Sequence, residues 1–508
     1  MIRELGEGYT TTLRNVYAGR VPGGADLVCY WFDKARAQIT AGALQRAGLV
    51  STNSIRGGAN RKVLDAICVE TRIFDAWSDE PWVNEGAAVG VSLIAFGCAE
   101  PSTYLDGARV NSIAADLSAH ANLGGSDLTK ARKLNQNHRA SFQGVLQVGD
   151  FDISGSLARS WLQLPNPHGK PSSAVLRPGI NGLDLVRRNR DVWLIDFGPT
   201  MAEGEAAFFE IPFQYVVGAI KPVRSSVRRE AHRKYWWRFG DARPALRDAL
   251  KSIPRYIATP LVAKHVLFVW VPSASLVYSA TPAITRADDT TFGILHSRFH
   301  ELWSLRLGTS LEDRPRYTPT TCFETFPFPA GLTPADTAHQ RTEALDGGAL
   351  IPAGLGAEFL EENRPLAQNI RAQEAIKREA NDALRAHAMA IAQAAHRLDG
   401  LRRNWLNPPE WTHRVPEVVP LGMDTSPYPD RIEPKPGLSE ADARALAQRT
   451  LTKLYNQRPA WLAQAHAQLN AAVAAAYGWA DYTPELQDDE ILRRLLALNL
   501  QRAAGGDT

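Results

Sequence analysis

The sequence lacks most of the features that identify common classes of protein. Its four cysteines are scattered with no C-x-x-C pair, which excludes a zinc cluster built from cysteine alone and a disulfide framework. The N-terminal stretch MIRELGEGYT carries two glutamates and no apolar run, unlike a signal peptide. The most apolar stretch, residues 265–280, contains Pro272 and several serines and is too short to span a bilayer. These absences predict a cytoplasmic protein without a membrane segment.

Signatures of common enzymes are missing too. The sequence contains no P-loop, HExxH, GxSxG or protein-kinase signature. His296 and His300 are spaced to share one helix face, but no third ligand accompanies them. We therefore expect a packed or phosphate-contacting histidine pair and no metal. Asp79 and Glu80 would suit a nuclease only with a matching lysine and a further acidic partner, which the sequence does not supply.

The bulk composition is that of a globular protein. The chain of 508 residues is too long for one ordinary core and predicts two to four domains. Hydrophobic residues make up 44% and charged residues 22% of it, without any low-complexity tract. A net charge of +3 is too small to indicate a partner, so the distribution of charge along the chain carries the information.

Residues 1–100 alternate between helical and strand patterns. The expected elements, in chain order, are a helix over 26–42, a strand over 47–54, a turn and helix over 56–67, and a hairpin of strands over 72–82 and 87–97. Helix, strand, helix and closing hairpin predict the second half of a doubly wound α/β sheet, with the first half absent.

The remainder changes character twice. Residues 101–330 contain β-rich runs between Pro/Gly loops and predict a mixed α+β domain, whereas residues 331–508 are Ala-rich and predict a helical tail. The strands expected in the first part cover 191–197, 210–220 and 264–272. In the tail we expect a long helix or helix pair over 366–406, a Pro-rich linker over 407–437, helices over 439–479 broken before Pro459, and a helix over 488–503.

Basic character is concentrated between Lys221 and Lys264, where twelve lysines and arginines accompany three acids. Aromatic residues interleave with these cations, as at Trp236 and Trp237. That combination suits phosphate contacts together with stacking or base-edge contacts, and favours nucleic-acid binding. The alternative is a solvated basic helix whose aromatic residues belong to the core.

The stretch Asn407-Pro408-Pro409-Glu410 is three quarters of the Asn-Pro-Pro-aromatic tetrapeptide of amino-methyltransferases. In that motif the Asn side-chain oxygen and a Pro carbonyl accept hydrogen bonds from the target amine, and the aromatic residue stacks on the flipped base. Glu410 offers no stacking face, and the stretch opens a Pro-rich linker after a long helix. We therefore expect a structural role for it.

Several long stretches in the same order resemble the MmeI-like (type IIL) adenine-N6 DNA methyltransferases of restriction and phage-defence systems. These stretches are residues 7–42, 47–67, 73–97, 291–329, 404–411 and 454–479. The resemblance covers essentially the whole chain. It implies the family's order of parts: cofactor loop, catalytic tetrapeptide, the rest of the sheet, a target-recognition domain and a helical tail. By that order the S-adenosylmethionine loop and the tetrapeptide lie upstream of Met1, so we expect no methylation of DNA by this chain alone.

The resemblance also implies roles for particular residues. Trp82 would stack on the flipped base, unless it only caps the sheet. Asn53 and Ser54, at the carboxyl end of a strand, would shape the catalytic pocket. Asp26 and Leu27 would reach the adenine rim of the cofactor. The residues expected to contact double-stranded DNA are Arg224, Arg228, Arg229, Arg233, Lys234, Trp236, Arg238, His296, Arg298 and His300.

The sequence thus predicts the C-terminal portion of an adenine-N6 DNA methyltransferase: residues 1–100 from the methyltransferase domain, 101–330 for target recognition and 331–508 as a helical tail. One alternative is a DNA-binding specificity subunit that acts with a separate chain supplying the S-adenosylmethionine-binding half. The other is an inactive remnant.

Overall fold

The structure is a computed structural model that describes residues 5–84, 87–98, 102–117, 128–311, 314–355 and 368–505. They form two compact units. The first comprises Met1–Ala131, Leu305–Arg316 and Gln487–Ala497, and the second comprises Arg132–Ser304, Tyr317–Leu486 and Leu498–Thr508. Most of the expected recognition region and most of the expected helical tail therefore pack together in the second unit.

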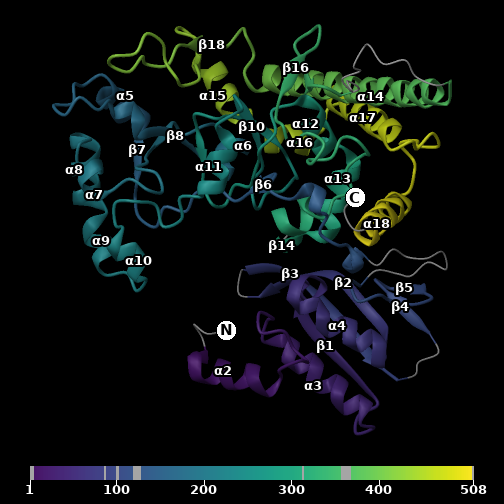
Figure 1. Ribbon diagram of the computed structural model, residues 1–508. Helices are drawn as coiled ribbons and strands as arrows, with labels where there is room; N and C mark the ends of the chain where they lie inside the picture. Colours follow the sequence, from purple (N-terminus) through teal and green to yellow (C-terminus); the bar gives the residue numbers. More distant parts are fainter. Residues whose placement is uncertain are drawn as a thin grey trace. The chain divides into compact units, whose positions relative to one another are not determined.

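The first unit combines helices with a five-stranded sheet (Figure 1). Its helices are α2 (Glu7–Val16), α3 (Val28–Thr40) and α4 (Gly58–Glu70). Its sheet contains β1 (Arg46–Thr52), β2 (Arg72–Asn84), β3 (Ala87–Gly97), β4 (Thr103–Leu105) and β5 (Ala108–Val110). The short hairpin of β14 (Thr309–Leu311) and β15 (Arg314–Arg316) belongs to the same unit. The helix, strand, helix and hairpin expected from the sequence are all present.

The sheet has the order β1-β3-β2-β4-β5. Strand β3 runs antiparallel to both β1 and β2, so β1 and β2 point in the same direction with β3 between them. Thr52 and Glu80 both pair with Val91, which places the carboxyl end of β1 level with the outer part of β2. The sheet is mixed, and a complete doubly wound sheet is not seen among the described residues.

The core of this unit follows from helical periodicity. Apolar residues of α3 and α4 recur every three or four positions and are buried on the sheet. Phe32 of α3 stacks on Phe96 of β3 with ring centroids 6.0 Å apart, and neither side chain is exposed. Each such buried aromatic ring stabilises the fold by about 2–3 kcal/mol through apolar burial.

The second unit contains two four-stranded sheets and two further hairpins. One sheet has the order β11-β10-β13-β6 and the other the order β12-β8-β9-β7. Their strands are β6 (Ser141–Phe142), β7 (Asp152–Ser154), β8 (Leu176–Ile180), β9 (Val192–Ile195), β10 (Arg255–Ala258), β11 (Val269–Pro272), β12 (Leu276–Val277) and β13 (Ala283–Ile284). The hairpins pair β16 (Thr342–Ala344) with β17 (Leu350–Pro352) and β18 (Thr412–Val415) with β19 (Arg431–Pro434).

Helices surround these sheets. They are α5 (Gly155–Leu162), α6 (Gly182–Val186), α7 (Glu203–Ala206), α8 (Glu210–Ala219), α9 (Lys221–Ser225), α10 (Glu230–Lys234), α11 (Pro244–Leu250), α12 (Asp289–His296), α13 (Arg298–Leu307), α14 (Gln368–Leu406), α15 (Glu440–Gln448), α16 (Leu451–Gln457) and α17 (Ala460–Ala476). Most of α18 (Asp488–Ala504) belongs to the first unit, which includes Gln487–Ala497. Residues 366–406 thus give one long helix where it is described. The segment 439–479 is broken before Pro459, as expected, and also near Arg449.

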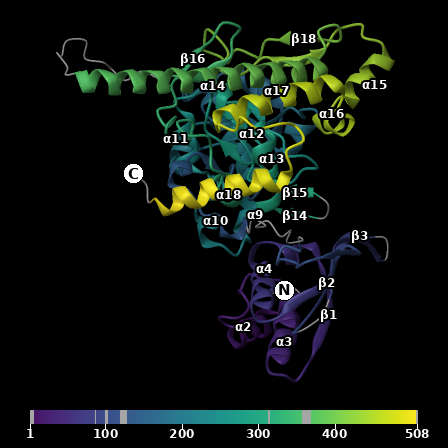
Figure 2. The same cartoon turned by 90° about the vertical axis from the view of Figure 1, so that its right-hand side faces the viewer.

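Helix α12 is the centre of the helical part. All of its residues are buried, and it contacts both α14 and α17, which lie side by side in the two views (Figures 1 and 2). A Cβ at Gly293 would lie 2.7 Å from Ile391 of α14 and 3.0 Å from Leu469 of α17. Glycine at this position therefore permits the close approach of the three helices.

The prediction of a strand over 210–220 is wrong. Glu210–Ala219 forms helix α8, although its run of β-branched and aromatic residues has high strand propensity. Phe213 and Val216 of this helix are buried in a core cluster with Trp236 and Phe197. Tertiary packing on one face therefore overrides the local propensity.

Candidate functional site

Ser54, expected in the catalytic pocket, and Asp26, expected at the adenine rim of the cofactor, lie together at the carboxyl end of β1. The Ser54 hydroxyl donates a hydrogen bond to Asp26 Oδ2 over 2.9 Å. Asn60, at the start of α4, donates to the same oxygen over 2.6 Å and accepts from the Asp26 amide over 2.8 Å. Because Asn60 is buried, it fixes Asp26 ahead of α3 and beside the end of β1. The carboxylate is thereby held in one place at the edge of the sheet.

Asn53 lies beside this pair and links the strands. Its amide nitrogen donates to Asp79 Oδ1 on β2, and its oxygen accepts from the Ser92 hydroxyl of β3 over 2.9 Å. A Cβ at Gly90 would lie 2.5 Å from Asp79 and 2.6 Å from Asn53. Gly90 therefore leaves the space in which this bridge forms.

Trp82 extends along β2 beyond this bridge and pairs with Val89 of β3. Its side chain is 48% exposed, so it is not part of the core. Leu27, which precedes α3, is 38% exposed. The hydrogen bonds thus connect Asp26 with Ser54 and Asn53 with Asp79, whereas Leu27 follows Asp26 in the chain and Trp82 lies three residues beyond Asp79 on β2.

The chemistry available at this edge is polar and uncharged apart from its carboxylates. Asp26 and Asp79 accept hydrogen bonds from Ser54 and Asn53, and no group of three or more His, Cys, Asp or Glu residues in the described chain is arranged to hold a metal ion. Hydroxyl, amide and carboxylate groups beside an exposed indole ring are suited to positioning a planar, hydrogen-bonding ligand. They supply neither an activated nucleophile nor a metal-bound water.

In the second unit, four of the expected DNA-contacting cations form an exposed basic surface. Arg228 and Arg229 lie just before α10, and Arg233 and Lys234 lie within it; all four side chains are exposed. Arg233 donates to the carbonyls of Val227 and Arg228 over 2.8 and 3.0 Å, which fixes the turn before the helix. In the described residues no carboxylate forms a salt bridge with these four cations. We call Arg228, Arg229, Arg233 and Lys234 the α10 basic surface.

Arg224 does not belong to this surface, and its prediction as a DNA contact is corrected. Its side chain is completely buried. It donates to the carbonyls of Gln147, His232 and Arg238 over 2.6–3.2 Å, and also to that of Val148. Burial lowers the pKa of its guanidinium. Arg224 thus cross-links α9, the end of α10 and a loop, beyond the reach of a phosphate.

The side chains of Trp236 and Arg238 also make their contacts within the protein. Trp236 is buried in the core cluster, so it cannot stack on a base. Arg238 donates to the carbonyls of Pro199, Thr200 and Met201 over 2.7–2.9 Å and lies over the ring of Tyr235. Its guanidinium anchors the loop 199–201. For Trp236 the prediction of a DNA contact is wrong, because burial removes its ring from any ligand.

His296 and His300 are buried, which contradicts a phosphate contact. His296 Nε2 lies 2.6 Å from a guanidinium nitrogen of Arg402, and His300 Nε2 lies 3.0 Å from the Tyr317 hydroxyl. Burial lowers the pKa of His296 well below its usual value and that of His300 to about 3. Arg298 donates over 2.8 Å to the carbonyls of Pro484 and Leu486, so it holds α13 against the loop before α18.

The Asn-Pro-Pro stretch has the structural role expected for it. Asn407 Oδ1 accepts a hydrogen bond from Arg188 over 2.5 Å. The Pro408 carbonyl accepts from the amides of Trp411 and Thr412 over 3.0 and 2.9 Å. Both groups that would accept from a target amine are therefore used by the protein itself.

Comparisons with known proteins agree with this architecture. Residues 212–330 match the family model "MmeI, target recognition domain". The fold of the chain is similar to that of part of a type IIL restriction-modification enzyme. The matching structure is that of MmeI in complex with DNA, at 18% sequence identity and a TM-score of 0.65, over 98% of this chain and 55% of the MmeI chain. The resemblance expected from the sequence is confirmed. No curated protein matches the sequence.

This chain thus spans about half the length of MmeI. The matched domain, residues 212–330, contains the α10 basic surface, and none of the described helices is long and apolar enough to cross a membrane. Sequence reasoning did not include Asn60, Ser92 or Gly90 in the site. Nothing in their local sequence marks them, because their role depends on the register of β1, β2 and β3.

Proposed function

We propose that this chain is the target-recognition and base-pocket portion of a site-specific DNA adenine-N6 methyltransferase of the restriction-modification type. The observation that carries the proposal is the match of residues 212–330 to the MmeI target recognition domain, together with an exposed basic surface inside that range. Four exposed cations on one short segment provide phosphate contacts, and phosphate contacts set the orientation of a protein on a duplex.

The edge of the first sheet supplies the pocket for the target base. Trp82 stacks on the base that has left the duplex, and the bridge between Asn53 and Asp79 ties β2, which carries Trp82, to the end of β1 across β3. Base–aromatic stacking contributes about 1–3 kcal/mol per base, which offsets part of the cost of unstacking. Specificity then comes from side chains of the recognition domain at base edges in a groove.

S-adenosylmethionine would supply the methyl group in the complete reaction. The described residues fit the rim of such a site only: Asp26 presents a fixed carboxylate and Leu27 an exposed apolar side chain. Gly57 and Gly58 follow β1 and open α4, but they form a Gly-Gly pair instead of the Gly-x-Gly turn that approaches the methionine part. The contribution of this chain to the reaction is therefore binding of DNA and positioning of the base.

Selection from a pool of randomised duplexes tests the proposal. The purified chain is mixed with the pool at about 150 mM salt, and bound duplexes are recovered and sequenced over several rounds. We expect enrichment of one short sequence that contains an adenine. Recovery of sequences no different from the starting pool would contradict a target-recognition function, and a selected sequence without adenine would contradict the adenine assignment alone.

A further inference from the structure

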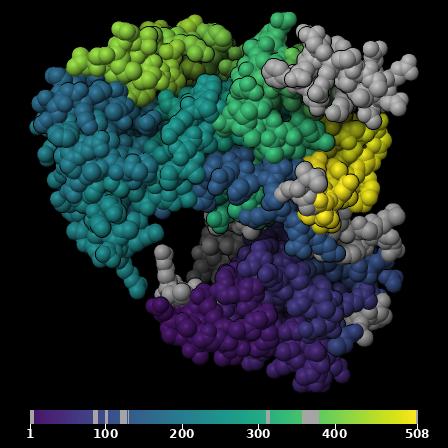
Figure 3. Space-filling view, viewed as in Figure 1, coloured from purple at the N-terminus to yellow at the C-terminus, as the bar shows by residue number. Residues whose placement is uncertain are grey.

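A cavity of about 490 Å³ lies inside the second unit, away from the α10 basic surface. It is bordered by β8, β9 and β11, by the carboxyl end of α14, and by the segment that leads into β19. In the space-filling view, the Pro-rich segment 407–437 and residues 150–200 form a continuous surface over this part of the unit (Figure 3). The volume is within the range of small-molecule sites, about 300–1,000 Å³.

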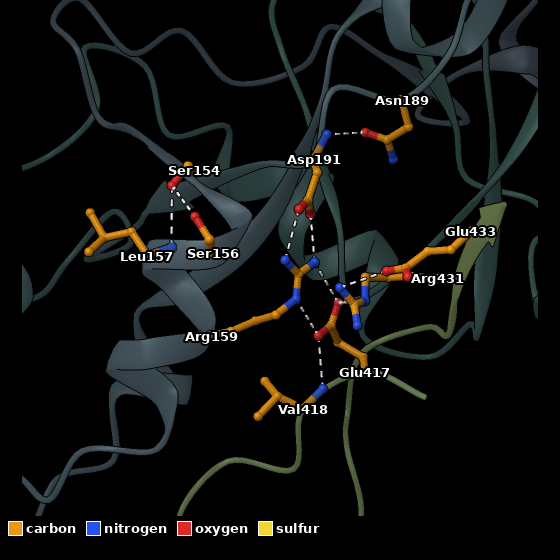
Figure 4. A network of polar contacts seen from close by, with 10 residues as sticks. All are labelled: Ser154, Ser156, Leu157, Arg159, Asn189, Asp191, Glu417, Val418, Arg431 and Glu433. Atoms are coloured by element: carbon orange, nitrogen blue, oxygen red, sulfur yellow. Dashed lines mark hydrogen bonds and ion pairs between the residues drawn. The ribbon is translucent and has the colours of Figure 1, made fainter. Parts of the chain in front are cut away.

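The acidic side chains that border the cavity form ion pairs with arginines. Figure 4 shows one wall, where Arg159 donates to both oxygens of Asp191 over 2.8 Å and to Glu417 over 2.8 and 3.1 Å. Arg431 pairs with Glu433 over 2.9 Å. On other walls, Asp184 pairs with Arg190 and Asp399 with Arg403, each over 2.9 Å.

Arg402 lines the cavity without such a partner. Its side chain is 2% exposed, and one terminal nitrogen donates to the Phe268 carbonyl over 2.8 Å while the other faces His296. In the described residues no carboxylate lies within ion-pair distance of it, and its Nε has no hydrogen-bond partner. A buried cation without a counter-charge is costly. A bound anion would offset this cost.

Arg188 adds a second cation to the same side. It donates to Asn407 and to the carbonyls of Leu406 and Leu446, which are neutral groups. Burial, and then the charge of Arg449, lower the pKa of its guanidinium. The carboxylates that border the cavity all form ion pairs, whereas Arg402 and Arg188 have no carboxylate partner among the described residues.

Trp270 contributes a further donor. Its Nε1 is buried and makes no hydrogen bond with a described residue, and the residue borders the cavity. Unsatisfied buried polar groups are rare in folded proteins. Three residues that border the cavity, Trp270, Arg402 and Arg431, have a nitrogen without a hydrogen-bond partner. All three nitrogens are donors, so the complementary ligand is rich in acceptors. The apolar side chains of Trp193, Val271 and Leu406 form another part of the lining.

We propose that this cavity binds a small organic anion, a phosphate ester or carboxylate with an apolar body. Arg402 and Arg188 supply the positive charge, and the apolar lining receives the body of the ligand. The inference does not depend on the proposed methyltransferase function, because the cavity residues take no part in the base pocket or the α10 basic surface. A bound anion would join β11 and the end of α14 to the sheet that contains β8 and β9.

Equilibrium binding of phenyl phosphate to the 508-residue chain tests the proposal. We expect one molecule per chain, weaker binding of inorganic phosphate, and no saturable binding of the neutral benzyl alcohol. At about 100 times Kd, phenyl phosphate should raise the melting temperature by a few degrees. The Val269→Phe variant fills the cavity and retains every cation, so it should lose the binding. The matched Val419→Phe variant alters an exposed position outside the cavity and should bind like the wild type.

Two results would overturn the proposal. One is the absence of saturable binding to the wild-type chain, and the other is equal binding by Val269→Phe and wild type, since both would show that the cavity takes no anion. Competition between phenyl phosphate and a short duplex without terminal phosphates distinguishes a DNA phosphate from a free small anion as the ligand. Competition by the duplex assigns the site to a DNA phosphate, and lack of competition assigns it to a free small anion.

Discussion

Arg224 and Arg228 are close in sequence but differ in role: the first is structural, and the second is a candidate for DNA contact. Arg224 is completely buried and bonded to backbone carbonyls, whereas Arg228 is exposed and free of any carboxylate among the described residues. The sequence places both in one basic run and gives no means of separating them. Only the packing of α9 against the loop 147–148 decides which arginine is structural. The same limit explains why Trp236, His296 and His300 were assigned to DNA.

The two arginines should respond differently to the same substitution. Arg224→Met removes the donor to four carbonyls, of which only that of Gln147 still accepts from a backbone amide, that of Gly240. It should lower the free energy of unfolding by about 3 kcal/mol. Arg228→Met should leave stability unchanged and weaken DNA binding. Urea unfolding and fluorescence anisotropy on a labelled duplex measure the two effects. A loss of DNA affinity by a stably folded Arg224→Met variant would contradict the structural assignment.

Trp82 is the residue whose change should affect the base pocket directly. Trp82→Ala removes a stacking contribution of about 1–3 kcal/mol, so affinity for a duplex with an unpaired target base should fall about 5-fold to 150-fold. Trp82→Phe retains an aromatic ring and should retain most of the wild-type affinity. The affinities of the wild type and the two variants are compared on a duplex that carries the selected recognition sequence, with the target adenine unpaired. Equal affinity of the alanine variant and the wild type would mean that Trp82 only caps the sheet.

At the scale of elements, periodicity was informative where one face of an element is buried. Helices α3, α4 and α18 and the hairpin β2–β3 follow the pattern of the sequence closely. The segment 210–220 was misassigned because its apolar residues satisfy a strand pattern as well as a helical one. The bridge between Asn53 and Asp79 could not be predicted either, since it depends on the register of three strands and on the missing side chain of Gly90.

The histidines of α12, α13 and α17 predict a loss of stability in acid. Burial lowers the pKa of His466 to about 4 and that of His300 to about 3, and His296 shifts the same way. In the unfolded chain histidine titrates near pH 6.5, so the unfolded state binds more protons below that pH. The stabilisation is present above about pH 6.5 and is lost progressively as the pH falls towards 4 and then 3.

Urea unfolding at pH 7, 6 and 5 measures this dependence. Below pH 6.5, each histidine that remains neutral in the folded state should lower the free energy of unfolding by about 1.4 kcal/mol per pH unit. His466→Gln retains a partner for the Tyr455 hydroxyl, which bonds His466 over 2.9 Å, and should remove one such contribution. An identical slope in His466→Gln and wild type would show that His466 is not held neutral.

At the scale of the whole molecule, the order of long sequence stretches predicted the architecture better than any single motif. The Asn-Pro-Pro stretch is the motif closest to a catalytic signature, and its acceptors are used by Arg188, Trp411 and Thr412. The boundary expected at residue 330 does not separate compact units, because α12 and α13 pack against the tail helices α14 and α17. Packing between segments distant in sequence leaves no trace in local composition.

The most direct test of DNA contact by the α10 basic surface is the dependence of affinity on salt. The logarithm of the association constant is plotted against the logarithm of salt concentration for the wild-type chain and two double variants. Arg228→Gln/Arg229→Gln removes half of the α10 basic surface, whereas Arg444→Gln/Lys453→Gln removes two exposed cations from α15 and α16. We expect a steep negative wild-type slope, reduced in magnitude by about 2 in the first variant and unchanged in the second. Equal slopes in all three chains, or an affinity independent of salt, would contradict the account.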